Sequence, residues 1–293
     1  MSMFGLPNVE KMKKRGDVRG LIHALSHRGE KDRDYEIRRD AHQALVLLGP
    51  VAVQPLIAEL DILKEKQPKI CADVARILAD IGDPRAVDAI VMLLMDIPVR
   101  HTPENVSEQD AMRQIFSSIA ASAGRFGDAI VLPLTPAFSH PLAGVREAAC
   151  MAIGAAANAA GQLGVLTEMP LRSALRDPNA AVRQVAAAAL SRLNWTSGDV
   201  GEQAWYSFAR QDWKKCVELG SAALEPLHFG LGNFDDEYIQ VKSVQCLGQI
   251  KDPGSLHELR MILVRDHTAM ISGQTRISFG LKQAILAATG GMP

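Results

Sequence analysis

A recurring amphipathic helix constrains the fold of this chain more than any other feature. One copy reads Ile37-Arg-Arg-Asp-Ala-His-Gln-Ala-Leu-Val-Leu-Leu-Gly49, and another reads Ile70-Cys-Ala-Asp-Val-Ala-Arg-Ile-Leu-Ala-Asp-Ile-Gly82. A third reads Val182-Arg-Gln-Val-Ala-Ala-Ala-Ala-Leu-Ser-Arg-Leu193. Each copy starts at an apolar residue, the anchor, and has small or apolar residues at anchor +4, +7, +8 and +11. These offsets lie on one stripe of a 3.6-residue helix and do not fit the alternation of a strand.

The spacing of the copies is that of a helix-pair repeat. Further copies begin at Ile115, Val145, Ile239 and Ile277, at intervals of roughly 30–45 residues apart from one longer gap that must hold an additional element. A second apolar helix lies between the copies, and breakers such as Gly49-Pro50 mark the turns. Since one pair cannot bury its apolar stripe alone, the sequence predicts an all-α solenoid, a right-handed superhelix of about seven stacked helix pairs.

Two short strings carry a resemblance to a known repeat class. Ile81-Gly-Asp-Pro-Arg-Ala-Val87 and its weaker echo Ile250-Lys-Asp-Pro-Gly-Ser-Leu256 resemble HEAT repeats of the short, phycobilisome-lyase-like (PBS lyase HEAT-like) class. The segment Asp212–Leu227 is similar to a motif that recurs in that class. The resemblance implies HEAT-like pairs whose second helices line a concave face. It implies little about function, because repeats of this class occur in many unrelated adaptor proteins.

The domain organisation follows from the repeats. We expect one continuous HEAT-like array over residues 1–293. Residues 1–30 are predicted to form a capping helix, around Val9 to Ser26, that exposes lysines and arginines. Residues 194–220 are predicted to be an irregular inter-repeat segment, and residues 96–109 a long projecting turn.

Composition and charge bear on the partner. Hydrophobic residues make up 47% of the chain and the formal net charge is −1, which suits a packed helical core and argues against a double-stranded DNA binder. The four cysteines are far apart and form no C-x-x-C pair, so we expect buried free thiols. No apolar run has the length of a signal peptide or a membrane span. These features predict a soluble, cytoplasmic protein with no membrane partner and no cofactor.

Three arginines directly follow an anchor and are candidates for partner binding: Arg38, Arg146 and Arg183. On a concave face they would form a basic ridge. At the position of Arg183, however, HEAT repeats carry a ladder of Asp–Arg hydrogen bonds, and Asp177 lies just before it across the turn. The resemblance therefore favours a structural role for Arg183. Arg146 has no such Asp close before it, which makes it the better ligand candidate.

Four further residues are candidate contacts. Arg100 and His101 lie in the predicted projecting turn, where a loop could grip a partner or be an insertion without a role. Trp205 and Tyr206 lie in the aromatic stretch of residues 194–220. Exposed Trp and Tyr are favoured interface anchors, but they also fill irregular cores, and core packing is the preferred interpretation of the tryptophans.

The function predicted from the sequence is a non-catalytic scaffold or adaptor that binds another protein along its concave face. A bilin lyase-type subunit is the main alternative. A HEAT-like DNA glycosylase is disfavoured by the acidic surroundings of the tryptophans, including Asp235-Asp-Glu237. A di-iron hydroxylase of the deoxyhypusine type displays several His-Glu pairs, whereas this chain has one, His257-Glu258. The sequence assigns no catalytic residue and no metal ligand, and it leaves the partner's identity and the oligomeric state open.

Overall fold

The computed structural model describes residues 7–27, 32–100, 106–160, 165–232, 236–272 and 277–290, and the regular structure in these ranges is entirely helical. Contacts divide the chain into two compact units. Unit 1 comprises Met1–Leu171 with Ala189–Leu193, and unit 2 comprises Arg172–Ala188 with Asn194–Pro293.

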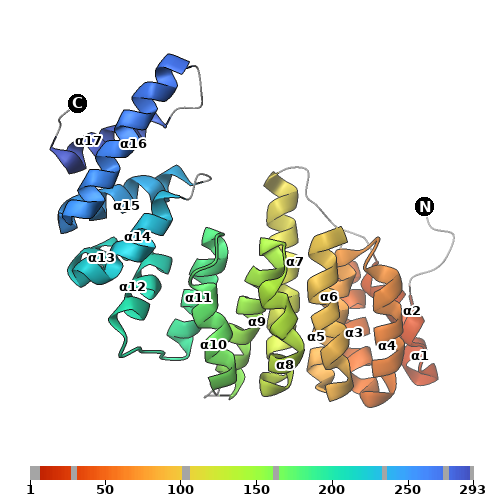
Figure 1. The fold of residues 1–293 in the computed structure, drawn as a ribbon. Coiled ribbons are helices and arrows are strands. Elements are labelled where there is room, and N and C mark those ends of the chain that lie inside the picture. Colours follow the sequence, from red (N-terminus) through yellow and green to blue (C-terminus); the bar gives the residue numbers. More distant parts are fainter. Residues whose placement is uncertain are drawn as a thin grey trace. The chain divides into compact units, whose positions relative to one another are not determined.

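Unit 1 is a two-layer stack of helix pairs. The second helices of the pairs form one layer, and they are α3 (Asp32–Leu48), α5 (Pro68–Ile81), α7 (Val106–Gly124) and α9 (Ala143–Ala160). The first helices form the other layer, and they are α2 (Val18–Leu25), α4 (Pro50–Leu63), η1–α6 (Pro84–Ala86 and Val87–Arg100) and η2–α8–η3 (Gly127–Ile130, Val131–Leu134 and Thr135–Ser139). Each first helix packs on the second helix of its own pair, and α3, α5, α7 and α9 pack on one another in chain order (Figure 1).

The anchor template explains this packing. In every copy the residues at anchor +4, +7 and +8 are buried; in α3 they are Ala41, Ala44 and Leu45. Small residues on the stripe bring the helices close together. A Cβ added to Gly124 of α7 would lie 2.4 Å from the Cβ of Ala155 in α9, so the contact between these helices requires glycine.

The N-terminal segment contains two helices where the sequence predicted one. Helix α1 (Val9–Arg15) ends at Gly16, which has a φ of 64°. Asp17 then caps α2, because its carboxylate accepts a 2.9 Å hydrogen bond from the backbone N–H of Gly20. The left-handed glycine followed by an N-cap aspartate breaks the apolar pattern into two short helices.

Helix α6 continues into the region predicted to be a projecting turn. Asp96 is helical and accepts a 2.9 Å hydrogen bond from Lys64 of α4, and Ile97 is fully buried. These contacts keep the chain helical at the start of the segment predicted to be a turn. Arg100 is the last residue of α6, but its side chain and the whole of His101 lie outside the described residues.

Unit 2 begins within the pair formed by α10 (Val165–Ala174) and α11 (Ala180–Arg192), whose residues it shares with unit 1. Its other elements are α12 (Val200–Ala209), α13 (Trp213–Leu219), η4 (Gly220–Ala223), α14 (Leu224–Leu231), α15 (Glu237–Ile250), α16 (Pro253–Ser272) and α17 (Phe279–Thr289). Helix α14 packs on α15, α16 packs on α17, and the second helices α15 and α17 pack on each other. The segment predicted to be irregular contains α12 and α13, which both lie in the long gap between anchors.

In both units consecutive helix pairs stack in chain order, which is the all-α solenoid architecture predicted from the sequence. Across the described residues, no single helix is long and apolar enough to cross a membrane. One pair of segments separated by a 120° bend, Asp110–Gly124 and Gly127–Ser139, meets the criterion by length and composition only.

Candidate functional site

The arginines that follow the anchors bind backbone carbonyls of the preceding turn. Arg183 is 2% exposed, and its Nη1 donates to the carbonyl oxygens of Asp177 and Pro178 at 2.7 and 2.8 Å. Arg146 makes the equivalent pair of bonds, to the carbonyls of His140 and Pro141 at 2.7 and 3.0 Å. Both guanidiniums therefore close the turn between the two helices of a pair.

This shared geometry gives Arg146 the same turn-closing contacts as Arg183, although no Asp precedes it. The acceptors are backbone carbonyls, so an aspartate side chain is not needed. The two turns are related in sequence, as His140-Pro-Leu-Ala-Gly-Val-Arg146 and Asp177-Pro-Asn-Ala-Ala-Val-Arg183, and this common pattern is the signal that could have revealed the role. Arg38 similarly donates to the carbonyl of His27 at 2.9 Å, but it also lines a pocket.

Arg183 lies against an aromatic cluster in the core of unit 2. Its guanidinium is 5.3 Å from the ring centroid of Phe208 and 5.5 Å from that of Phe229. Trp205, which is 3% exposed, packs edge-on against the same two rings. Burial lowers the pKa of Arg183, while the carboxylates of Asp177 and Asp236 act in the opposite direction. Trp205 and Arg183 thus contribute to the core and have almost no surface to offer to a partner.

Tyr206, next in sequence, lies at the surface of unit 2. It lines a hollow of about 320 Å³, together with Trp195, Thr196, Ser197, Gln203, Ser207, Arg210, Asp212 and Lys215. The rings of Trp195 and Tyr206 contact each other, with centroids 5.3 Å apart, and Arg210 lies over the outer ring face of Tyr206. The polar groups of this hollow are largely engaged in local turns; Asp212, for example, caps α13.

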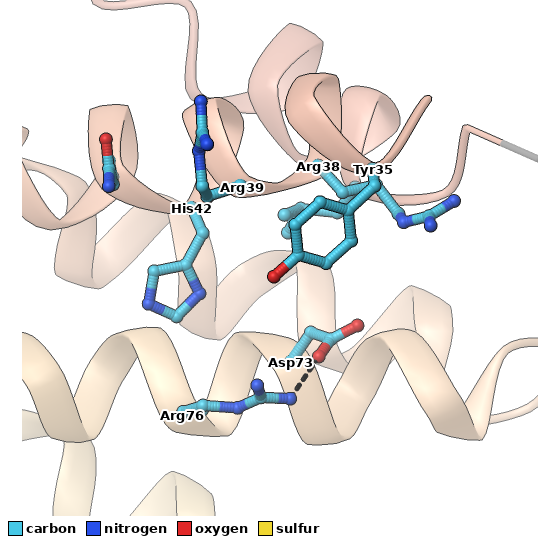
Figure 2. A pocket seen from close by; sticks show the side chains of 8 residues that line it. Tyr35, Arg38, Arg39, His42, Asp73 and Arg76 are labelled. Carbon is cyan, nitrogen blue, oxygen red and sulfur yellow. Dashed lines mark hydrogen bonds and ion pairs between the residues drawn. The ribbon is translucent and has the colours of Figure 1, made fainter. Parts of the chain in front are cut away.

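A second pocket lies on the second-helix layer of unit 1, between α3 and α5. It has a volume of about 390 Å³, and we call it the α3–α5 pocket. Its lining residues are Leu25, Tyr35, Arg38, Arg39, His42, Gln43, Asp73 and Arg76. Figure 2 shows Tyr35 and His42 extending from α3 toward α5, whose Asp73 and Arg76 form the opposite wall. Tyr35 is 61% exposed, so its ring forms a free edge of the pocket.

The lining of the α3–α5 pocket is rich in cationic side chains. Three arginines and a histidine line the pocket together with one carboxylate, that of Asp73, which forms an ion pair with Arg76. Burial raises the pKa of Asp73 above its usual value, although Arg76, His42 and Arg38 each act to lower it. Leaving His42 out of the count, the lining carries two more positive than negative charges, with three arginines against one aspartate.

An ion-pair chain extends from the pocket across the next repeat. His42 Nε2 lies 2.7 Å from Asp80 Oδ2, and the other carboxylate oxygen of Asp80 accepts from Arg125, which follows α7. Burial by itself would raise the pKa of Asp80, but the hydrogen bonds from Arg125 and His42 outweigh it and hold the pKa below its usual value. Three successive repeats are thereby joined on the face that carries the pocket.

The sequence singled out only Arg38 in this pocket. Tyr35, Arg39 and His42 escaped notice because their positions on α3 lie opposite the buried stripe, where polar residues are ordinary. The available signal was their spacing, at i, i+4 and i+7, which places an aromatic, an arginine and a histidine on one face of a helix. The residues of α5 that these side chains face depend on the register in which α3 and α5 stack. The sequence alone does not reveal this register.

A histidine in unit 2 lies within hydrogen-bond distance of both a serine and a carboxylate, as the catalytic histidine of many hydrolases does. His228 Nε2 is 2.9 Å from Ser255 Oγ, and His228 Nδ1 is 3.0 Å from Glu258. However, Ser255 is 1% exposed and its hydroxyl donates to Asp252 at 2.9 Å. A nucleophile must be reachable by substrate and give its proton to the histidine, so this network serves to hold the start of α16 against α14.

The cysteines give no sign of redox or metal chemistry in their surroundings. All four, Cys71, Cys150, Cys216 and Cys246, are buried and lie outside any disulfide bond. Burial raises the thiol pKa to about 12 for Cys71 and Cys216 and to about 11 for Cys246. Over the described part of the chain, no group of three or more His, Cys, Asp or Glu side chains is arranged to hold a metal ion.

One repeat of the chain matches a known family. Residues 70–94 match the PBS lyase HEAT-like repeat. The matched stretch comprises most of α5 and α6, including Asp73 and Arg76 of the pocket and the Ile81–Val87 string. The resemblance to HEAT repeats inferred from the sequence is confirmed over this repeat.

Other comparisons add little about function. Among solved structures, human deoxyhypusine hydroxylase in complex with glycerol is similar over 97% of this chain and 98% of its own, with 17% identity and a TM-score of 0.35. A likeness at that TM-score carries no argument about the site. Among curated proteins, none matches this sequence. The assignment of a function therefore depends on the HEAT-like architecture and on the site itself.

Proposed function

We propose that the protein is a non-catalytic scaffold that binds another protein through the second-helix face of unit 1, with the α3–α5 pocket at the contact. The pocket is the observation that supports the proposal most directly. Tyrosine and arginine are the residue types that most often dominate binding energy at protein interfaces. Here an exposed Tyr35 stands at the mouth of a pocket lined by three arginines.

The solenoid architecture supports a scaffold in a second way. Stacked repeats expose a long surface made of the same face of successive helices, and such surfaces are suited to extended partners. The His42–Asp80–Arg125 chain fixes α3, α5 and the end of α7 relative to one another on this face. A surface fixed before binding loses less conformational entropy when a partner docks.

Exposed apolar side chains alone would not identify the contact face. Ile62 on α4, in the first-helix layer, is 61% exposed, which equals the exposure of Tyr35 on α3. Scattered single apolar residues are normal on soluble proteins. This equality makes Ile62 a matched control, because truncating either side chain should have little effect on folding.

Affinity purification with tagged protein tests the proposal. We expect wild type and Ile62→Ala to recover the same protein in near-stoichiometric amount, and Tyr35→Ala to lose it while keeping the helical circular dichroism of wild type. Recovery of a nucleic acid or a tetrapyrrole without any protein would contradict the scaffold, and so would equal recovery by all three forms.

A further inference from the structure

The α3–α5 pocket has the chemistry of an oxyanion site. Arg76 and His42 reach it from opposite walls, and the hydroxyl of Tyr35 points into the same space (Figure 2). Guanidinium groups bind carboxylate and phosphate oxygens through paired N–H donors, and a phenol adds one more donor. A volume of about 390 Å³ accommodates one side chain of a partner.

The charges of the pocket arginines are only partly compensated. Arg38 donates a hydrogen bond to the carbonyl of His27. Because a carbonyl is neutral, this bond does not compensate the positive charge of the guanidinium. Arg76 has Asp73 as its ion-pair partner, and Arg39 forms an ion pair with its sequence neighbour Asp40. The Arg39–Asp40 pair is solvent-exposed, and exposed ion pairs of this kind are weak.

The arrangement fits a discrete anionic group better than a nucleic-acid backbone. Carboxylates of Asp40, Asp73 and Asp80 interrupt the cations along α3 and α5, so the positive field is confined to one spot. A polyphosphate chain needs a continuous basic track, and the chain as a whole has a formal net charge of −1.

From these observations we infer that the α3–α5 pocket binds an oxyanion, a carboxylate or a phosphate, displayed on an acidic peptide segment of the partner protein. The inference rests on the proposed function and adds the chemistry that the partner must present. Asp73 then acts as an internal competitor, because its carboxylate occupies Arg76 until the partner's oxyanion arrives.

Fluorescence anisotropy with short labelled peptides tests the inference on the full chain. Three peptides differ at their central residues, which are glutamates, phosphoserines or glutamines. We expect the two anionic peptides to bind about tenfold or more tightly than the glutamine peptide, and binding to weaken as salt is raised. The tighter of the two anionic peptides distinguishes a carboxylate from a phosphate as the partner's group.

Variants that remove a positive charge and a variant that removes a negative charge should change peptide binding in opposite directions. Arg76→Gln and Arg39→Gln should each weaken binding of the anionic peptides about tenfold, since each removes charged donors. Asp73→Asn should strengthen it several-fold, because the competing carboxylate is gone. Arg19→Gln, which removes an arginine 78% exposed on α2, is the control and should leave binding unchanged.

The outcomes separate the inference from the proposed function. Equal binding of the anionic and glutamine peptides would overturn the oxyanion site while leaving a peptide-binding surface intact. Weaker binding by Asp73→Asn would also overturn it, because a pocket selective for cations or neutral groups behaves that way. If no peptide binds at any concentration reached, the oxyanion site is wrong, and affinity purification with Tyr35→Ala decides the scaffold independently.

Discussion

Arg183 illustrates what a single buried charge does in this fold. Its guanidinium closes the turn before α11 and lies against Phe208 and Phe229, with 2% of its surface exposed. We predict that Arg183→Lys lowers the free energy of unfolding of unit 2 by about 2 kcal/mol, because an ammonium cannot satisfy both carbonyls and keep a planar contact with the rings. Urea denaturation followed by tryptophan fluorescence measures the change.

Arg176→Lys is the matched control, since Arg176 lies over Trp205 at 5.1 Å but is exposed. It should cost at most about 1 kcal/mol. An effect of Arg176→Lys equal to that of Arg183→Lys would contradict the role assigned to burial. The same reasoning makes Arg146→Glu and Arg183→Glu unsuitable probes of binding, because either change would disturb folding.

Lys251 occupies a position that calls for glycine. It ends α15 with a φ of 59°, as Gly82 ends α5 with a φ of 71°, and the N–H of each cap donates to the carbonyl four residues before it. A left-handed conformation is strained for a residue with a Cβ. We predict that Lys251→Gly raises the free energy of unfolding by about 0.5–1 kcal/mol, and that Gly82→Lys lowers it by a similar amount, both measured by urea denaturation. A destabilising Lys251→Gly would mean that the lysine side chain makes a compensating contact.

Single residues were predicted from the sequence with uneven success. The repeat context indicated a structural role for Arg183 with an aspartate as its partner. In the structure Arg183 donates to backbone carbonyls, and Arg146 makes the equivalent bonds to the carbonyls of His140 and Pro141, which the emphasis on an aspartate concealed. Backbone carbonyls belong to every residue, so a sequence pattern cannot show which of them an arginine reaches. The residues of the α3–α5 pocket other than Arg38 were missed for a related reason, because they become neighbours only through the register of α3 on α5.

At the scale of elements, the second helices of unit 1 are joined by more than apolar packing. Asp80 of α5 accepts from His42 of α3 and from Arg125 at the end of α7. These bonds keep the pKa of Asp80 lower in the folded protein than in the unfolded chain. A lowered carboxyl pKa stabilises the folded state above the ordinary Asp pKa of about 3.9, and this stabilisation is lost as the pH falls through the folded value.

The pH dependence of one variant tests this ion-pair chain. We predict that Asp80→Asn lowers the free energy of unfolding by about 1 kcal/mol at neutral pH. The difference from wild type should shrink as the pH falls below about 3.9 and be gone once the pH is below the lowered pKa of Asp80 in the folded state. Urea titrations of both proteins across this range give the comparison. A difference that stays constant into acid would show that Asp80 stabilises the fold by packing, independently of its charge.

The helices themselves were largely predictable. The stripe at anchor +4, +7 and +8 is buried in every copy, because small and apolar residues at helical spacing have no other favourable place in a stack. Helix ends were harder to predict. The break at Gly16 depends on Asp17, whose carboxylate accepts the capping hydrogen bond at the start of α2. The continuation of α6 depends on the hydrogen bond that Lys64 of α4 donates to Asp96. Such tertiary contacts outweigh local propensity.

At the scale of the whole molecule, two units of stacked helix pairs each contribute a different surface. Unit 1 carries the α3–α5 pocket and the ion-pair chain, whereas unit 2 has Trp205 and Phe208 buried in its core and Tyr206 beside a hollow at its surface. The sequence predicted the stacked helix pairs and the repeat class, since both follow from periodicity and short motifs. It could not predict which unit carries the binding surface, because that depends on which side chains of neighbouring helices lie next to one another.

Site-specific photo-crosslinking tests the central claim most directly. A benzoylphenylalanine replaces Tyr35 at the mouth of the α3–α5 pocket in one variant and Ile62 on α4 in another, two positions that are both 61% exposed. We expect irradiation in cells to yield one dominant protein adduct from position 35 and none of that species from position 62. Equal adducts at both positions, or a dominant adduct at position 62 alone, would contradict the assignment of the second-helix face of unit 1 as the binding surface.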